Sequence, residues 1–162
     1  MDFSTNSIIL EEELLPLIRE RLAAGFAVRY MPFRGVSMLP MLRQGKDSVE
    51  LSPLPEKLKK FDLPVYQRPN GQLVMHRVLD VKEDHYICMG DNTEVFEKIY
   101  PNQMIGVVSA FRRGEKRIEV TDRSYQLYCR LWRPLRPLRK GYKALKRLAK
   151  KCLKKFFGRC AH

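Results

Sequence analysis

The sequence predicts a mainly β fold with one helix at its start and one at its end, on three observations. Between Phe26 and Asp122, short segments rich in Val, Ile, Tyr and Phe alternate with Pro, Gly and Asn, which is typical of strands joined by turns. The 162 residues include ten prolines and nine glycines, a turn-rich composition that disfavours a helical bundle. With 44% hydrophobic and 30% charged residues, the chain has the composition of a globular protein with a single core.

An amphipathic helix is predicted over residues 7–24. Apolar residues recur there at helical spacing, acidic residues fall in the first turns, and Gly25 follows the last periodic position. The segment is too short to hold both helices of a helix-turn-helix DNA-binding motif. We therefore interpret residues 1–25 as a single N-terminal helix.

Seven strands are predicted within residues 26–122, which we interpret as one β domain. They cover residues 26–33, 47–51, 63–67, 72–81, 85–89, 104–112 and 117–121. Asn70-Gly71 predicts a tight hairpin between the third and fourth strands, because both residues tolerate the positive φ angles of a two-residue turn. A second hairpin is expected to turn at residues 82–84.

Residues 123–162 are predicted to form a basic helical tail. They carry 14 of the 31 Lys and Arg residues and no acidic residue, so the net charge of +13 belongs to this segment. A first helix is expected to end before Pro134, since proline removes a backbone donor and clashes with the preceding turn. On a helical wheel, residues 138–157 place apolar side chains on one side and Lys and Arg on the other, which predicts a cationic amphipathic helix.

Such a helix can lie flat in the headgroup region of an anionic membrane, and this is the interpretation that we favour for residues 138–157. Two alternatives stay open: the apolar side packs on the β domain, or the basic side contacts nucleic acid, which is the least favoured partner. The sequence has no run of eighteen apolar residues and does not begin like a secretion signal. We therefore expect a cytoplasmic protein that is peripheral at the inner membrane surface.

Ser37 and His76 are the candidates for a nucleophile and its base. Ser37 lies between a glycine and a proline in Gly-Val-Ser-Met-Leu-Pro (35–40), which suits either an ordinary turn or a serine presented on a tight loop. His76 lies inside the apolar run 73–79, which suits either a core histidine bonded to a carbonyl or a general base. A serine hydroxyl needs such a base, because it is protonated and weakly nucleophilic at neutral pH.

The base in turn needs a hydrogen-bond partner on its second ring nitrogen, which fixes the tautomer. Asp91, in the Gly-Asp-Asn segment 90–92, is our first candidate, and Glu97 is the second. Gly-Asp-Asn also suits a simple turn. The order along the chain, with a serine, then a histidine and then an acid fifteen residues later, favours the catalytic interpretation.

In this order the motifs resemble those of the signal peptidase I superfamily of serine peptidases, which also contains the self-cleaving repressors. The histidine in place of the usual lysine is similar to the archaeal, sporulation and endoplasmic-reticulum types. The resemblance covers residues 26–111 and includes the acid-led segment 47–51 and the Ile-Gly-Val-Val segment 105–108. It implies the β fold of that superfamily and a serine endopeptidase that cleaves an extended leader or precursor peptide, with small residues near the cut.

The resemblance also implies a role for each candidate. Ser37 attacks the peptide carbonyl, His76 takes and returns the proton, and Asp91 orients His76. Glu97 aligns with a second acidic position of the endoplasmic-reticulum type and is the alternative orienting acid. The main-chain amide of Ser37 donates to the oxyanion. Gly35 stands where bacterial signal peptidases have a hydroxyl that assists this amide, which leaves the second donor unassigned.

The chain departs from its apparent relatives in two further respects. Processing enzymes of this superfamily usually have a membrane-spanning segment and the repressors have a DNA-binding domain, and we recognise neither in the sequence. A non-catalytic peptide-binding or membrane-adaptor module on the same fold is therefore the alternative function. We expect no metal or organic cofactor. The four cysteines match neither a zinc site nor a CxxC pair, and we expect reduced thiols at Cys88, Cys129, Cys152 and Cys160.

Overall fold

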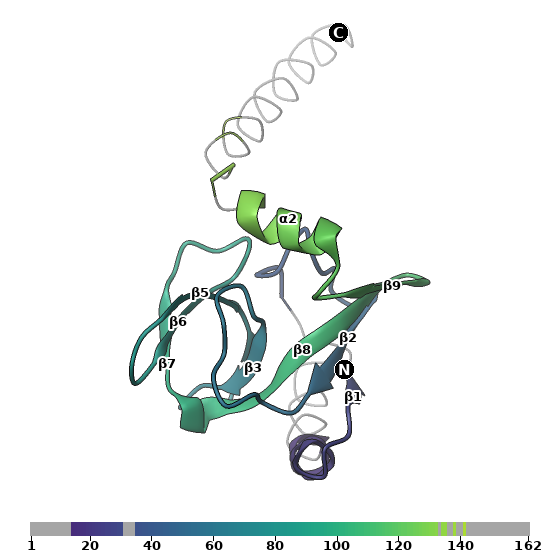
Figure 1. The fold of residues 1–162 in the computed structure, drawn as a ribbon, viewed down its shortest axis with the longest axis vertical. Coiled ribbons are helices and arrows are strands. Elements are labelled where there is room, and N and C mark those ends of the chain that lie inside the picture. The colour runs from purple at the N-terminus through teal and green to yellow at the C-terminus, as the bar shows by residue number, and fades with distance from the viewer. Residues whose placement is uncertain (1–13, 31–34, 133, 136–137, 139–140, 142–162) are drawn as a thin grey trace, which may run out of the picture. The chain divides into compact units, whose positions relative to one another are not determined.

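The computed structural model describes residues 14–30, 35–132, 134–135, 138 and 141 (Figure 1). The chain forms two compact units, Met1–Gln126 and Leu127–His162. The first unit contains two antiparallel sheets and a helix over residues 14–23, and a second helix, α2 (Arg123–Trp132), runs from the first unit into the second. The prediction of a mainly β fold is therefore confirmed.

The larger sheet is built around its longest strand, β8. In order, it contains β1 (Val28–Tyr30), β2 (Asp47–Ser52), β8 (Met104–Arg113), β3 (Pro64–Gln67) and β4 (Leu73–Met75), and β9 (Lys116–Glu119) also pairs with β8. Five apolar residues of β8 are buried: Met104, Ile105, Val108, Ala110 and Phe111. The strand is long enough to pair with β2, β3 and β9, all antiparallel, which accounts for its central position.

The smaller sheet contains β5 (Arg77–Val81), β6 (Tyr86–Met89) and β7 (Glu97–Ile99). One cluster of buried apolar residues joins both sheets. Its members are Leu58, Tyr66, Val74, Val78, Tyr86, Cys88, Ile99 and Met104. Because these side chains come from β3, β4 and β8 on one side and from β5, β6 and β7 on the other, this cluster packs the two sheets against each other.

The sequence-based strand assignment differs from the structure at two places that matter for function. The strand predicted over residues 72–81 is two strands, with β4 in the larger sheet, β5 in the smaller sheet and His76 between them. The continuous apolar run concealed this break, because the chain is buried on both sides of the change of sheet. The strand β7, which begins at Glu97, was not predicted.

The helices agree with the sequence where the structure describes them. In the first helix, residues 14–23, Ile18 and Leu22 are buried (purple in Figure 1). A Cβ atom at Gly106 of β8 would lie 2.8 Å from Leu22 Cδ1, so the glycine gives the helix room to approach the sheet. The end of α2 at Trp132 agrees with the expected stop before Pro134. Residues 7–13 and most of 138–157 lie outside the described residues, and none of the described helices is long and apolar enough to cross a membrane.

Candidate active site

A cleft of about 460 Å³ brings together the three segments that the sequence singled out. Its walls include the loop that carries Ser37, the chain from Gln72 to His76 and the first residue of β7, Glu97. Ser37 is half-buried, and His76 is only 4% exposed. Residues separated by about forty and twenty positions in the sequence therefore share one cavity.

The turn at residues 90–92 holds the Ser37 loop in place. The main-chain N–H of Asn92 donates to the carbonyl of Ser37 at 2.7 Å, and the Asn92 side-chain amide donates to the carbonyl of Val36 at 3.1 Å. A Cβ atom at Gly90 would lie 2.8 Å from the Ser37 carbonyl oxygen and 3.0 Å from Ser37 Cβ. The glycine and asparagine of the Gly-Asp-Asn motif therefore position the serine segment.

Gly35 has a backbone conformation that explains why a glycine occurs two positions before the serine. Its φ angle is +137°, a value that residues with a side chain rarely adopt. Its N–H donates to the side-chain oxygen of Gln44 at 3.1 Å, and Gln44 also lines the cleft. A hydroxyl-bearing residue at this position would strain the backbone, so the loop differs locally from the pattern that it resembles.

His76 is hydrogen bonded through Nδ1. This atom lies 3.1 Å from Glu97 Oε1 and 3.0 Å from the hydroxyl oxygen of Tyr66. The Tyr66 hydroxyl donates to Glu97 Oε2 at 3.1 Å, so its oxygen remains able to accept a hydrogen bond. These contacts favour the tautomer in which Nδ1–H donates to Glu97 and Tyr66, and in that tautomer Nε2 carries the free lone pair.

Arg68 fixes the Glu97 carboxylate from the other side. Its Nε donates to Oε2 at 2.8 Å and its Nη2 donates to Oε1 at 2.5 Å, a two-point contact that sets the carboxylate plane. The remaining guanidinium nitrogen, Nη1, donates to the side-chain oxygen of Gln72 at 2.6 Å. The imidazole, the carboxylate and the guanidinium thus form one continuous network on the wall of the cleft.

The electrostatics of this network favour a neutral imidazole beside an ionised carboxylate. Burial is the main reason why the pKa of His76 lies below its ordinary value, and the charge of Glu97 opposes this only in part. Burial alone would raise the pKa of Glu97, but the hydrogen bonds and charge of Arg68, with His76 and Tyr66, hold it below its ordinary value. Burial, followed by the charge of Glu97, raises the pKa of the Tyr66 phenol, which therefore stays protonated.

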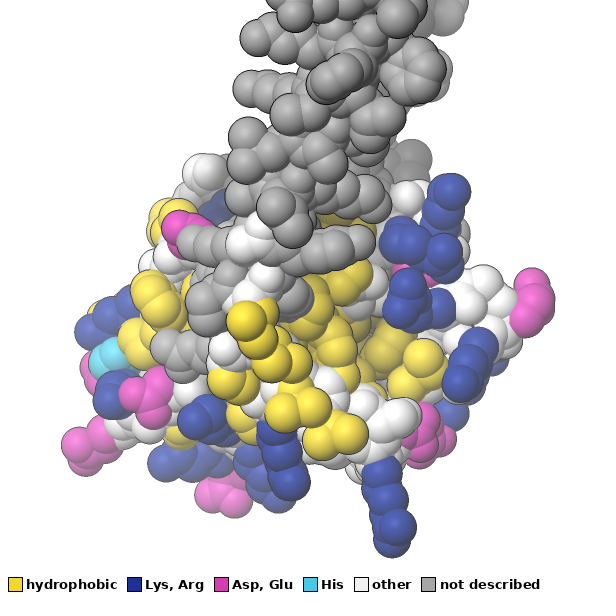
Figure 2. Space-filling view, turned by 90° about the horizontal axis from the view of Figure 1, so that it is seen from above, with side chains coloured by type: hydrophobic (Ala, Val, Ile, Leu, Met, Phe, Trp, Pro, Cys, Tyr) yellow, Lys and Arg dark blue, Asp and Glu magenta, His cyan; other side chains and the backbone are white. Residues whose placement is uncertain are grey.

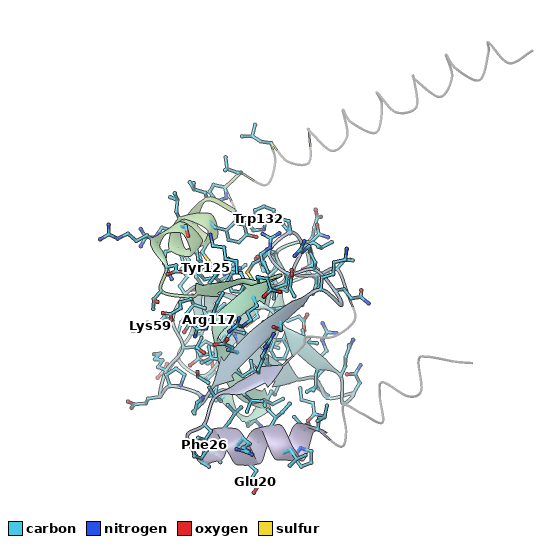
Figure 3. All side chains as sticks on the ribbon, turned by 90° about the vertical axis from the view of Figure 1, so that its right-hand side faces the viewer. Glu20, Phe26, Lys59, Arg117, Tyr125 and Trp132 are labelled. Carbon is cyan, nitrogen blue, oxygen red and sulfur yellow. The ribbon has the colours of Figure 1, made fainter. Side chains whose placement is uncertain are left out.

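Asp91, our first candidate for the acid that orients His76, pairs with Arg77. Arg77 Nε donates to Oδ1 at 2.8 Å and Nη2 donates to Oδ2 at 2.7 Å, and both side chains are 2% exposed. Arg77 also donates to the Tyr125 hydroxyl at 2.8 Å, where Tyr125 points from α2 toward the sheets (Figure 3). Among the described residues, the carboxylate hydrogen bonded to His76 is that of Glu97, so the structure favours the second of the two acids.

Tyr66 and Arg68 are the site residues that sequence reasoning missed. Tyr66 lies in a predicted strand and Arg68 begins a predicted hairpin turn, so both positions suggested only structural roles. A signal was present for β7, because the segment 95–100 contains four apolar residues directly before the Pro101 turn. Recognising that strand would have placed Glu97 next to β6, opposite Cys88.

The candidate nucleophile Ser37 and the candidate base His76 are not in direct hydrogen-bond contact. Among the described residues, no hydrogen bond joins the Ser37 hydroxyl to His76, and catalytic hydrogen bonds are often long until substrate binds. Among the residues that the structure describes, no cluster of three or more His, Cys, Asp or Glu side chains is arranged to hold a metal ion.

Comparison with known proteins finds no family model that matches the chain and no matching curated protein.

Proposed function

We propose that the protein is a serine endopeptidase of the signal-peptidase-like type, with Ser37 as nucleophile, His76 as general base and Glu97 as the acid that orients His76. The observation that carries the proposal is the 3.1 Å contact between His76 Nδ1 and Glu97 in the cleft that Ser37 also lines. The two-sheet β architecture is consistent with the signal-peptidase-like fold. Asp91 supports the site through Arg77 and the turn at residues 90–92.

The proposed mechanism follows from the tautomer of His76. Nε2 accepts the Ser37 proton while the Ser37 oxygen forms a bond to the substrate carbonyl carbon, and the carbonyl oxygen becomes an oxyanion. The imidazolium then gives the proton to the leaving amine as the peptide bond breaks, and a water molecule deacylates Ser37 by the reverse proton transfers. The Ser37 amide donates to the oxyanion, a contribution of roughly 3 kcal/mol to the barrier in comparable sites. Glu97 stays ionised throughout and stabilises the imidazolium.

The substrate is proposed to be an extended peptide that pairs with β4. This strand stands at the end of the strand order in the larger sheet, and residues 72–75 line the cleft. Main-chain hydrogen bonds to such a strand give affinity, and pockets for alternate side chains give specificity. The apolar side chains of Met38, Leu42 and Val95 in the cleft suit uncharged residues next to the scissile bond. A leader or precursor peptide has this chemistry.

The alternative is a non-catalytic peptide-binding module on the same fold. The lack of a direct hydrogen bond from the Ser37 hydroxyl to His76 among the described residues favours it. Such a module would bind extended peptides in the same cleft and release them unchanged. The two functions therefore differ in product formation and agree in peptide binding.

A peptide-library cleavage assay read by mass spectrometry distinguishes these two functions. We expect cleavage by the wild-type protein and losses of at least ~10³-fold for Ser37→Ala and for His76→Ala. His85→Ala is the matched control, because His85 pairs with Asp84 at the surface, and we expect it to keep full activity. Binding without cleavage by the wild-type protein would establish the alternative.

A further inference from the structure

The Ser37 loop has room for a substrate carbonyl but supplies only part of what its oxyanion needs. Sites that stabilise an oxyanion combine several donors, from the main chain and from side chains such as Asn and Gln. The Ser37 amide is one such donor. Gly35 has no hydroxyl to add, and a Cβ atom there would meet no described atom within 4 Å. Gly35 also lines the cleft, so the cleft is open at this end of the loop.

Gln44 approaches this open end with an amide group. Its Oε1 accepts the Gly35 N–H at 3.1 Å, and its side chain lines the cleft together with Gly35 and Ser37. Because a main-chain N–H only donates, it faces the amide oxygen, and the two N–H donors of Nε2 remain for other partners. No hydrogen bond among the described residues uses them. Since the two polar atoms of an amide are about 2.2 Å apart, Nε2 lies within roughly 5.5 Å of the Gly35 nitrogen.

The turn that carries Gln44 is fixed to the larger sheet through Asp47, the first residue of β2. Asp47 is 2% exposed, and its Oδ2 accepts the main-chain N–H of Arg43 at 2.7 Å. The Arg43 guanidinium donates to the same carboxylate at 3.0 and 2.7 Å, and the Asp47 N–H donates to the Arg43 carbonyl at 3.2 Å. Gln44 follows directly after Arg43, so its main chain is held in place without a substrate. Donors that are already in place cost no reorganisation during the reaction.

Other polar side chains of the cleft near the Ser37 loop have structural partners. The Asn92 amide donates to the loop itself, at the Val36 carbonyl, and the Thr93 hydroxyl donates to a main-chain carbonyl of its own turn at 3.2 Å. The Arg43 guanidinium holds the carboxylate of β2. Gln44 therefore combines contact with the loop and donors that are available to a ligand.

We propose that Gln44 is a further catalytic residue, whose side-chain amide donates to the oxyanion that forms when Ser37 attacks the substrate. This inference rests on the proposed peptidase function. As the Ser37 oxygen bonds to the carbonyl carbon and His76 takes the serine proton, the π electron pair of the carbonyl moves to its oxygen. The Ser37 N–H and the Gln44 Nε2–H both donate to this charge until the leaving amine departs and the carbonyl re-forms. Gln44 keeps its protons throughout.

Gln44→Glu tests the role, because the carboxylate keeps an acceptor for the Gly35 N–H but has no donor. In the cleavage assay we expect kcat to fall at least about 10²-fold, with KM and Tm close to the wild-type values. A peptide aldehyde, which forms a tetrahedral adduct with a serine, should bind about 10²-fold more weakly, whereas an uncleaved peptide should bind equally well. Gln44→Met removes the donors without adding charge and should lose a similar factor in kcat.

Asn102→Asp is the matched control, because it makes the same amide-to-carboxylate change at an exposed residue outside the cleft. Lys and Arg side chains lie among Asp and Glu on the face seen in Figure 2, so one more surface carboxylate changes the overall field little. This variant should keep the wild-type kcat.

The possible failures are distinguishable. If the wild type cleaves peptides and either Gln44 variant keeps its kcat within threefold, the oxyanion role is wrong and the peptidase function stands. A loss confined to KM or Tm would show that Gln44 only holds the loop, which also overturns the role. A wild-type protein that cleaves no peptide of the library would overturn the peptidase function and this role together.

Discussion

Two arginine–carboxylate pairs support the cleft, and their comparison separates a candidate catalytic group from a structural one. Arg68–Glu97 and Arg77–Asp91 are both two-point contacts. The Arg77–Asp91 side chains are 2% exposed, whereas those of Arg68 and Glu97 are 32% and 16% exposed and line the cleft. Of these two carboxylates, the one that is hydrogen bonded to the His76 imidazole among the described residues is that of Glu97. The same type of ion pair is therefore structural where it is fully buried, as in Arg77–Asp91. It belongs to the candidate site where its carboxylate contacts His76, as in Arg68–Glu97.

The largest effect is expected from Glu97→Gln. The amide keeps the shape of the carboxylate but loses the charge that stabilises the imidazolium, and it permits the wrong tautomer, so kcat should fall by about 10³–10⁴-fold. Steady-state cleavage measures this loss. Glu119→Gln is the control, because Glu119 pairs with Arg117 in an exposed network, and its kcat should be unchanged. A kcat of Glu97→Gln within threefold of the wild type would contradict the assignment.

Asp91→Asn should act mainly on stability. It removes the charge of Asp91 from the buried Arg77 guanidinium, which costs about 3 kcal/mol of unfolding free energy. Denaturant unfolding measures the loss, and Asp80→Asn, which breaks an exposed pair with Lys82, should cost less than about 1 kcal/mol. If Asp91→Asn is as stable as the wild type but inactive, the roles of the two acids are reversed.

Gly90→Ala tests whether the turn that carries Asp91 also positions Ser37. The new methyl group would meet the Ser37 backbone at 2.8 Å, and a shift of the nucleophile by a fraction of an ångström should lower kcat by about 10²-fold. We expect a normal KM for a peptide held mainly by β4. A Cβ at Gly141 meets nothing within 4 Å, so Gly141→Ala should leave kcat unchanged. Equal kcat values for the two variants would remove the positioning role.

The smallest effect is a shift of the pH profile in Arg68→Ala. Catalysis needs neutral His76, so the rate falls as the pH drops through its pKa, which lies below the ordinary value chiefly because of burial. The charge of Arg68 also lowers this pKa, so its removal should move the acid limb of kcat/KM to higher pH. An NMR titration of the His76 ring should move in the same direction. Arg117→Ala is the control, because it removes an arginine from an exposed ion pair, and it should leave the acid limb and the His76 titration unchanged. A shift of the acid limb to lower pH in Arg68→Ala would contradict this account.

The long strands and the meeting of the serine and histidine segments could be predicted from sequence. Strands β2 and β8 have clear apolar patterns, and the order of the motifs indicated that Ser37 and His76 share a site. The break at His76 could not be predicted, because a continuous apolar run fits one buried strand as well as two strands in different sheets. Tertiary pairing, with β4 on β3 and β5 on β6, decides where the run divides.

The choice between the two acids also depended on tertiary structure. Successive residues of an extended chain point to opposite sides, so His76 and Arg77 face different groups. Asp91 meets Arg77, and Glu97 meets His76 because β7 pairs with β6 in a register that sets Glu97 opposite Cys88. Spacing along the chain favoured Asp91, since the register of β7 on β6 is not visible in the sequence and the short apolar signal of residues 95–100 was not recognised as a strand.

Covalent labelling with a fluorophosphonate tests the central claim most directly, because it reports an activated serine without a known substrate. We expect one adduct per wild-type chain by intact mass, mapped to Ser37 by peptide analysis, and a labelling rate at least ~10²-fold lower in His76→Ala. Exposed Ser124 provides the internal control and should stay unlabelled. No adduct, an adduct elsewhere, or an unchanged rate in His76→Ala would contradict a Ser37–His76 pair activated in this cleft.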